Sequence, residues 1–171
     1  MEERSGIITM GGNPLTLIGK ALSKGDAAPD FEVLANDLSP VNFSSYKGKL
    51  CVISSVPSLD TPVCDMQTRK FNEAAGKLSD DTVILTISAD LPFAQTRWCG
   101  AAGVENVVTL SDHRDVSFAQ AYGVLIKELR LLARAVFVVD QEGIIRHAEI
   151  VSEVKNEPDY DAALGVLNQL V

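Results

Sequence analysis

The sequence is short of basic residues, of cysteines and of long hydrophobic runs. Its 171 residues include 15 Lys and Arg against 23 Asp and Glu, a net charge of −8. A protein that follows a nucleic-acid backbone needs clustered basic residues, and an anionic membrane surface repels an acidic chain. No apolar run approaches the ~18 residues of a membrane span, and the first residues lack the basic and apolar regions of a secretory signal. We therefore expect a soluble, cytoplasmic protein that binds neither nucleic acid nor membrane.

Cysteine is especially scarce. The three residues Cys51, Cys64 and Cys99 are too few for the disulfide framework of a small secreted protein. The sequence has no C-x-x-C or H-x-x-x-H pair, which argues against a structural zinc site because its ligands usually lie close together in sequence. In a reducing compartment a functional cysteine acts through the reactivity of its thiol and not through a structural disulfide. The residues around each cysteine are therefore informative.

The overall composition is that of an ordinary globular domain, with 46% hydrophobic and 22% charged residues. The length and the absence of a linker predict a single domain over residues 1–171. Apolar periodicity and turn residues predict a β-hairpin over about residues 6–19 and then alternating strands and helices. The expected strands are 50–56, 82–87, 106–110, 133–139 and 144–151, and the expected helices are 62–78, 91–99, 116–122 and one that Pro158 opens. This order predicts an α/β fold with a central mixed β-sheet flanked by helices on both faces.

The loop between the 50–56 strand and the next helix places a cysteine at a helix start. Thr61 is a good N-cap, Pro62 suits the first helical position, and Cys64 then falls at the third. Unpaired N–H groups and the positive end of the helix dipole favour a thiolate there, and the thiolate is the nucleophilic form. The alternative is a small buried hydrophobic residue, which is the commoner role of a free cysteine. The strand–loop–helix context favours the reactive role.

The other two cysteines and one arginine are weaker candidates. Cys99 precedes a glycine-bearing segment that could bring its sulfur to Cys64, and the alternative is a core cysteine beside Trp98. Cytosolic reductants would keep a permanent disulfide open, so such a pair would be transient. Arg134 begins an apolar strand, where a cation needs an anionic partner such as a thiolate; the alternative is a surface arginine whose head group reaches solvent. Cys51 lies inside an apolar strand and is expected in the core.

Two other kinds of cysteine site fit the sequence poorly. A C-x5-R phosphatase loop that starts at Cys64 requires arginine where Lys70 stands, and it requires glycines that residues 64–70 lack. A Cys–His protease needs a partner among His113 and His147, and neither lies in a typical context. Neither class is expected.

The motif Pro57-x-x-x-Thr61-x-x-Cys64 before a helix resembles the active-site motif of the peroxiredoxins. Further segments are similar to one branch, the bacterial thiol peroxidases of the atypical two-cysteine type. These segments are the N-terminal hairpin and residues 25–31, 60–64, 97–100, 120–124, 133–138 and 157–160. The resemblance covers nearly the whole chain and implies a thioredoxin-like fold.

The resemblance also implies a role for each matching residue. Cys64 would be the peroxidatic cysteine, which attacks hydrogen peroxide or an alkyl or lipid hydroperoxide and becomes a sulfenic acid. Cys99 would be the resolving cysteine, which forms a transient intrachain disulfide with Cys64 that thioredoxin reduces. Thr61 would hydrogen-bond the thiolate and the peroxide, and Arg134 would stabilise the thiolate and polarise the O–O bond. Pro57 would shield the thiol from water. The family further implies antioxidant defence, a homodimer and no metal or organic cofactor.

Two features depart from the family pattern, and two other functions remain open. Segment 123–132 is a few residues shorter than in many relatives and lacks their Gly-Pro loop, which leaves the rim of the site and the dimer contacts undecided. Trp98 stands where phenylalanine is usual.

A general thiol–disulfide oxidoreductase is one alternative function, although that chemistry normally uses a C-x-x-C motif. The other is a peroxide sensor, in which oxidation of Cys64 switches a partner interface without turnover.

Overall fold

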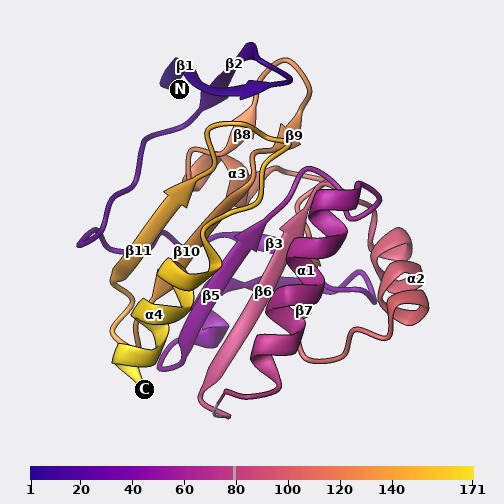
Figure 1. Cartoon of the computed structure of the whole chain (residues 1–171), viewed down its shortest axis with the longest axis vertical. Helices are drawn as coiled ribbons and strands as arrows, with labels where there is room; N and C mark the ends of the chain where they lie inside the picture. Colours follow the sequence, from indigo (N-terminus) through magenta and orange to yellow (C-terminus); the bar gives the residue numbers. More distant parts are fainter. Residues whose placement is uncertain (79) are drawn as a thin grey trace.

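A seven-stranded mixed sheet forms the centre of the computed structural model, which describes residues 1–78 and 80–171 (Figure 1). The strands lie in the order β11 (Ile145–Ile150), β10 (Ala135–Val139), β5 (Leu50–Ser55), β6 (Thr82–Ser88), β7 (Val108–Ser111), β3 (Glu32–Leu34) and β4 (Pro40–Asn42). Strands β5, β6 and β7 run parallel, whereas the outer strands pair antiparallel with their neighbours. The expected mixed sheet is confirmed.

Helices cover both faces of this sheet. The sheet therefore separates two hydrophobic cores, one on each face. The helices are α1 (Pro62–Ala75), α2 (Pro92–Ala102), α3 (Ser117–Ala121) and α4 (Tyr160–Leu170). Successive residues of a strand face opposite sides of the sheet, so Val52 of β5 packs with Phe71 of α1 and Leu167 of α4. Its neighbour Ile53 packs with Phe118 of α3 in the other core. All six residues of β5 are buried as a result, and Figure 1 shows α1 and α4 together in front of the sheet.

The N-terminal hairpin is confirmed, and it belongs to a second, four-stranded sheet. It pairs β1 (Glu3–Met10) with β2 (Asn13–Ile18) and therefore begins a few residues earlier than expected. The short segment 123–132, for which the sequence predicts no strand, contributes β8 (Leu125–Ile126) and β9 (Leu131–Leu132). The chain requires glycine at position 19, directly after β2, because a Cβ there would collide with the carbonyl oxygen of Gln120.

Several element boundaries differ from the prediction. Helix α2 continues through Gly100 because Gly103 is the residue that adopts the left-handed conformation ending it, with φ 67°. Helix α1 ends at Ala75, where Gly76 is the C-cap. Asp159 caps α4 by accepting a hydrogen bond from Ala162 N, so Pro158 precedes the cap and does not open the helix. Strand β4 and the 3-10 helix Phe43–Tyr46 were not predicted. No helix within the described ranges has the length and apolar character needed to cross a bilayer.

Candidate active site

Cys64 lies in the first turn of α1, at the third helical position, as predicted. Thr61 is the N-cap and Pro62 is the first helical residue. The Thr61 side chain makes no capping bond to the helix, and its hydroxyl donates to the carbonyl oxygen of Ser58 at 3.0 Å. The positive end of the helix dipole therefore acts on the thiol without a capping oxygen beside it, and this favours an anion at Cys64.

The Cys64 side chain is also fully buried, with 0% of its surface exposed. It packs against Val56 and Leu59 of the loop that follows β5, and the half-buried Trp98 of α2 packs against the same cluster. Removing an anion from water is unfavourable unless a charge or hydrogen-bond donors compensate for the lost hydration. The polar groups near this cluster therefore decide what the thiol can do.

Arg134 supplies a buried positive charge directly before β10. Only 2% of its surface is exposed, so the interpretation as a surface arginine is wrong. Its Nε donates to the carbonyl oxygen of Val154 at 2.9 Å, and its Nη1 donates to Oε1 of Gln67 at 3.0 Å. Gln67 is itself 0% exposed and donates through Nε2 to the hydroxyl of Ser54 at 2.6 Å. Gln67 follows Cys64 by about one helical turn, so the helix that carries the thiol also holds the guanidinium.

Tyr160, the first residue of α4, packs beside α1. Its hydroxyl donates to Oε1 of Glu157 at 3.0 Å, and its ring packs edge-on against Phe71 of α1. Burial raises the pKa of Tyr160, and the hydrogen bond and charge of Glu157 raise it further. The charge of Arg134 acts in the opposite direction, while that of Cys64 raises the pKa. The Tyr160 hydroxyl therefore stays protonated near neutral pH.

Asp90 anchors the loop that carries Pro57 into the helix. Its carboxylate accepts hydrogen bonds from the Ser58 hydroxyl at 2.7 Å, from Leu59 N at 2.8 Å and from the Ser88 hydroxyl at 2.7 Å. Pro57 is buried at the start of this loop. The loop is thus tied to the end of β6, and this fixes the entry of the chain into α1.

Cys99 does not face Cys64. It is half-buried on α2, and its Sγ lies 3.5 Å from the hydroxyl of Thr109, which in turn donates to Oδ1 of Asn36 at 3.1 Å. The preceding residue, Trp98, is the one that packs against the Cys64 cluster. Both cysteines are free thiols. The structure therefore places the predicted pair on neighbouring helices without joining them.

Similarity to known proteins extends over nearly the whole chain. The sequence model of the Redoxin family matches residues 23–164. The thiol peroxidase of Halalkalibacterium halodurans is 60% identical over 157 residues, which cover 92% of this chain and 94% of that protein. The thiol peroxidase of Bacillus subtilis is 57% identical over 164 residues, which cover 96% of this chain and 98% of that protein. The chain belongs to the thiol peroxidases of the Redoxin family. The solved peroxiredoxin-like protein of Aquifex aeolicus matches with a TM-score of 0.91 at 40% identity and covers 98% of each chain, which confirms the thioredoxin-like fold.

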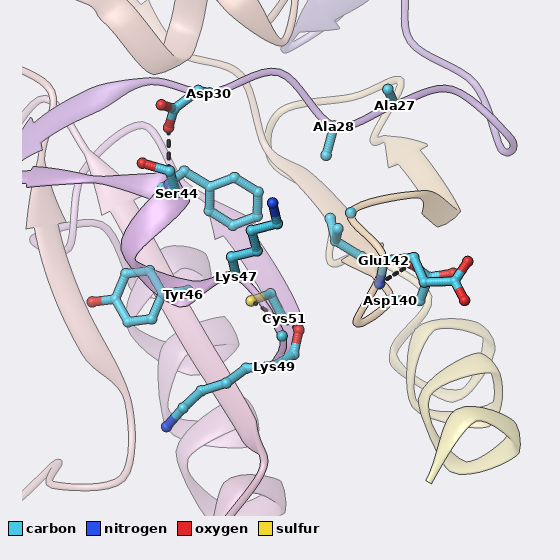
Figure 2. A pocket seen from close by; sticks show the side chains of 14 residues that line it. Ala27, Ala28, Asp30, Ser44, Tyr46, Lys47, Lys49, Cys51, Asp140 and Glu142 are labelled. Atoms are coloured by element: carbon cyan, nitrogen blue, oxygen red, sulfur yellow. Dashed lines mark hydrogen bonds between the residues drawn. The ribbon is translucent and has the colours of Figure 1, made fainter.

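The third cysteine of this thiol peroxidase sequence lies in a different pocket, of about 290 Å³ (Figure 2). Cys51 is near the start of β5, whereas Cys64 follows the end of that strand. The pocket therefore lies at the opposite end of the parallel strands from Cys64. Figure 2 shows Lys47 and Lys49 near Cys51, with Asp140 and Glu142 across the pocket. Burial raises the pKa of the Cys51 thiol to about 12. The thiol therefore stays protonated near neutral pH, and the prediction that Cys51 belongs to the core is confirmed.

Sequence reasoning missed three residues around the site of this family member. Gln67 carries a local signal, because it follows Cys64 by one turn and so lies on the same side of the helix. Tyr160 lies in segment 157–160, which carries the family resemblance, but no role at the site was predicted for it. Asp90 follows a buried parallel strand, which is the edge where polar groups of α/β folds gather. Their contacts with Arg134 and Ser58 depend on tertiary packing and have no sequence signature.

Proposed function

We propose that Cys64 is the peroxidatic cysteine of a thiol-dependent peroxidase. Its thiolate attacks the terminal oxygen of a hydroperoxide, the O–O bond breaks, and the alkoxide leaves after taking a proton. The products are a Cys64 sulfenic acid and an alcohol, or water when hydrogen peroxide is the substrate. The observation that carries the proposal is the burial of this thiol at the start of α1, on the helix whose Gln67 holds Arg134.

Arg134 and Thr61 assist Cys64 in this first step. Nε and Nη1 of Arg134 are engaged by Val154 and Gln67, and we assign to Nη2 the donation to the thiolate and to the charge that develops on the leaving oxygen. The Thr61 hydroxyl donates a hydrogen bond to the Ser58 carbonyl oxygen, so its oxygen can accept a hydrogen bond from the peroxide O–H. A rotation of the Thr61 side chain lets the same hydroxyl donate to the thiolate. Pro57, buried in the same loop, keeps water from the thiol.

Cys99 then closes the cycle as the resolving cysteine. Its thiol attacks the sulfenic sulfur of Cys64, a disulfide forms and water leaves. A dithiol reductant, which we take to be thioredoxin, reduces this disulfide by exchange. We place this cycle in the cytoplasm, as a homodimer that removes hydrogen peroxide and alkyl or lipid hydroperoxides in antioxidant defence. The three free thiols suit that reducing environment.

Intact mass and non-reducing peptide mapping after one equivalent of cumene hydroperoxide test this proposal. We expect the loss of two hydrogens and a peptide that links Cys64 to Cys99. One added oxygen on Cys64 with Cys99 free would contradict the two-cysteine cycle, and an unmodified Cys64 would contradict the proposal itself. Continued peroxide consumption with thioredoxin, its reductase and NADPH then separates an enzyme from a sensor, because a sensor oxidises once and stops.

A further inference from the structure

Three side chains tie α1 to α2 directly beside the two cysteines. The indole Nε1 of Trp98 donates to Oδ1 of Asp65 at 2.9 Å, and Nε of Arg69 donates to Oδ2 of Asp65 at 2.9 Å. The Arg69 guanidinium lies 5.8 Å from the centre of the Trp98 ring, and its Nη1 donates to the carbonyl oxygen of Ala102 at 3.2 Å. We name Asp65, Arg69 and Trp98 the α1–α2 latch.

The latch holds the residues on which disulfide formation depends. Asp65 follows Cys64 and Trp98 precedes Cys99, so each half of the latch is one residue from a reacting sulfur. The Trp98 ring packs against the Cys64 cluster while Cys99 is turned to Thr109. A disulfide needs Cα atoms within about 7 Å and Cβ atoms that point toward each other. Trp98 thus occupies the place beside the Cys64 cluster that Cys99 must take, so the indole has to leave before the two sulfurs can bond.

Helix α2 is also held in its N-terminal half, where Nε2 of Gln95 donates to the Ser88 hydroxyl at 3.0 Å and to the Leu110 carbonyl oxygen at 2.9 Å, so the latch acts on the C-terminal half that carries Cys99. Its N-cap makes no side-chain hydrogen bond, Gly100 lies within the helix, and Gly103 ends it. Helices of this length are marginal in water, so they persist through tertiary contacts. The last carbonyl groups of a helix lack partners within it, and Arg69 satisfies the one at Ala102. The latch therefore stabilises both the packing and the C-terminal end of the segment that must move.

We propose that Asp65 is a positioning residue that, with Arg69, clamps Trp98 and so sets the rate at which Cys99 reaches oxidised Cys64. This inference rests on the proposed roles of Cys64 and Cys99. While the latch is closed, the Cys64 sulfenate remains exposed to a second peroxide molecule, which transfers an oxygen to it and gives a sulfinic acid and an alcohol. The strength of the latch thus sets which fraction of the Cys64 sulfenate forms the disulfide and which fraction is overoxidised.

Transient kinetics of Asp65→Ala test the latch, with Asp65→Asn and Glu73→Ala as companions. Trp98 is the only tryptophan, so stopped-flow fluorescence reports both sulfenate formation, which depends on peroxide concentration, and disulfide formation, which does not. In Asp65→Ala we expect the disulfide-forming phase to accelerate roughly tenfold, as expected for a lost hydrogen bond to a charged group. The first phase should stay within about twofold, since the dipole contribution of one half-buried carboxylate is small. Asp65→Asn keeps an acceptor for the indole and should lie between Asp65→Ala and wild type, and Glu73→Ala, on the same helix, should match wild type.

A chemical quench provides a second readout that is independent of fluorescence. Alkylation at set times followed by mass analysis counts the Cys64–Cys99 disulfide and the doubly oxygenated Cys64. In Asp65→Ala at high peroxide we expect less sulfinic acid per turnover. An unchanged or slower disulfide phase in this variant, while wild type shows both phases, overturns the latch. If wild type itself shows no disulfide phase, the proposed role of Cys99 fails instead.

Discussion

Nη1 of Arg134 donates a hydrogen bond to Oε1 of Gln67 at 3.0 Å, and both side chains are almost completely buried. Gln67 lies on the helix that begins at the thiol, so the guanidinium and Cys64 are tied to one rigid element. The second bond, from Nε to Val154, fixes the plane of the guanidinium. The positive charge is therefore oriented before a substrate arrives, which is the condition for electrostatic stabilisation of a developing negative charge.

Replacing Gln67 by Met keeps the volume of the side chain and removes the acceptor for Arg134. We expect the second-order rate constant of Cys64 with hydrogen peroxide to fall roughly tenfold, because a hydrogen bond to a charged group contributes about 1.5–3 kcal/mol. Stopped-flow fluorescence of Trp98 measures it. Met66→Leu changes an exposed neighbour on the same helix and should leave the rate constant unchanged. A Gln67→Met protein as fast as wild type would show that Arg134 needs no support from α1.

Replacing Arg134 by Met removes the buried charge itself. We expect the first step to slow by roughly 100-fold, the range seen when one donor to a developing oxyanion is lost. Once the sulfenate has formed, the disulfide step should keep its rate, because Arg134 acts on the O–O bond. Arg114→Met, at an exposed arginine paired with Glu32 and Asp115, is the matched control. An unaltered first phase in Arg134→Met would remove this residue from the site.

The three cysteines should separate into three behaviours. Cys64→Ser should abolish peroxide consumption, because the hydroxyl is not a comparable nucleophile at neutral pH. Cys99→Ser should reduce one equivalent and then stop as a sulfenic or sulfinic acid. Cys51→Ala should retain turnover with thioredoxin, because its buried thiol remains protonated. Peroxide consumption per protein molecule measures all three. Sustained turnover by Cys99→Ser would assign the resolving role to another thiol.

The stability of the fold should depend on the ionisation of Asp112. Burial raises the pKa of this carboxyl from 3.8 to about 6, although the N–H groups of Ala119 and Phe118 act against that shift. The folded protein thus binds the proton more tightly than the unfolded chain does. The resulting stabilisation is complete below about pH 4 and is lost as the pH rises through about 6. By linkage the loss amounts to at most about 3 kcal/mol.

Urea unfolding at several pH values between 4 and 7 measures this effect. Asp112→Asn carries no charge at any of these values, so its free energy of unfolding should rise relative to wild type as the pH increases. Glu105→Gln, at an exposed carboxylate, should follow the wild-type curve. Parallel curves for wild type and Asp112→Asn would mean that Asp112 ionises normally in the folded protein.

Much of the site could be predicted because a helix start is encoded locally. Thr61 and Pro62 set the first turn of α1 through their own backbone preferences, and Cys64 then occupies the third position wherever that helix lies. The unbroken apolar run of β5 likewise predicts a strand that is covered on both faces. In contrast, β8 and β9 have two residues each, too few for a periodic pattern, and form only because β2 offers a partner.

The sequence by itself determined the type of each long element, the position of Cys64 at the start of α1 and the residue types available for chemistry. Only the tertiary structure decided which of them meet. Gln67 and Arg134, like Asp65 and Trp98, are far apart along the chain and make contact because α1 packs on the sheet with α2 beside it. Packing also decided that Trp98 packs against the cluster that contains Cys64, while Cys99 contacts Thr109. Local backbone preferences act over a few residues, whereas these contacts depend on burying the two faces of one sheet.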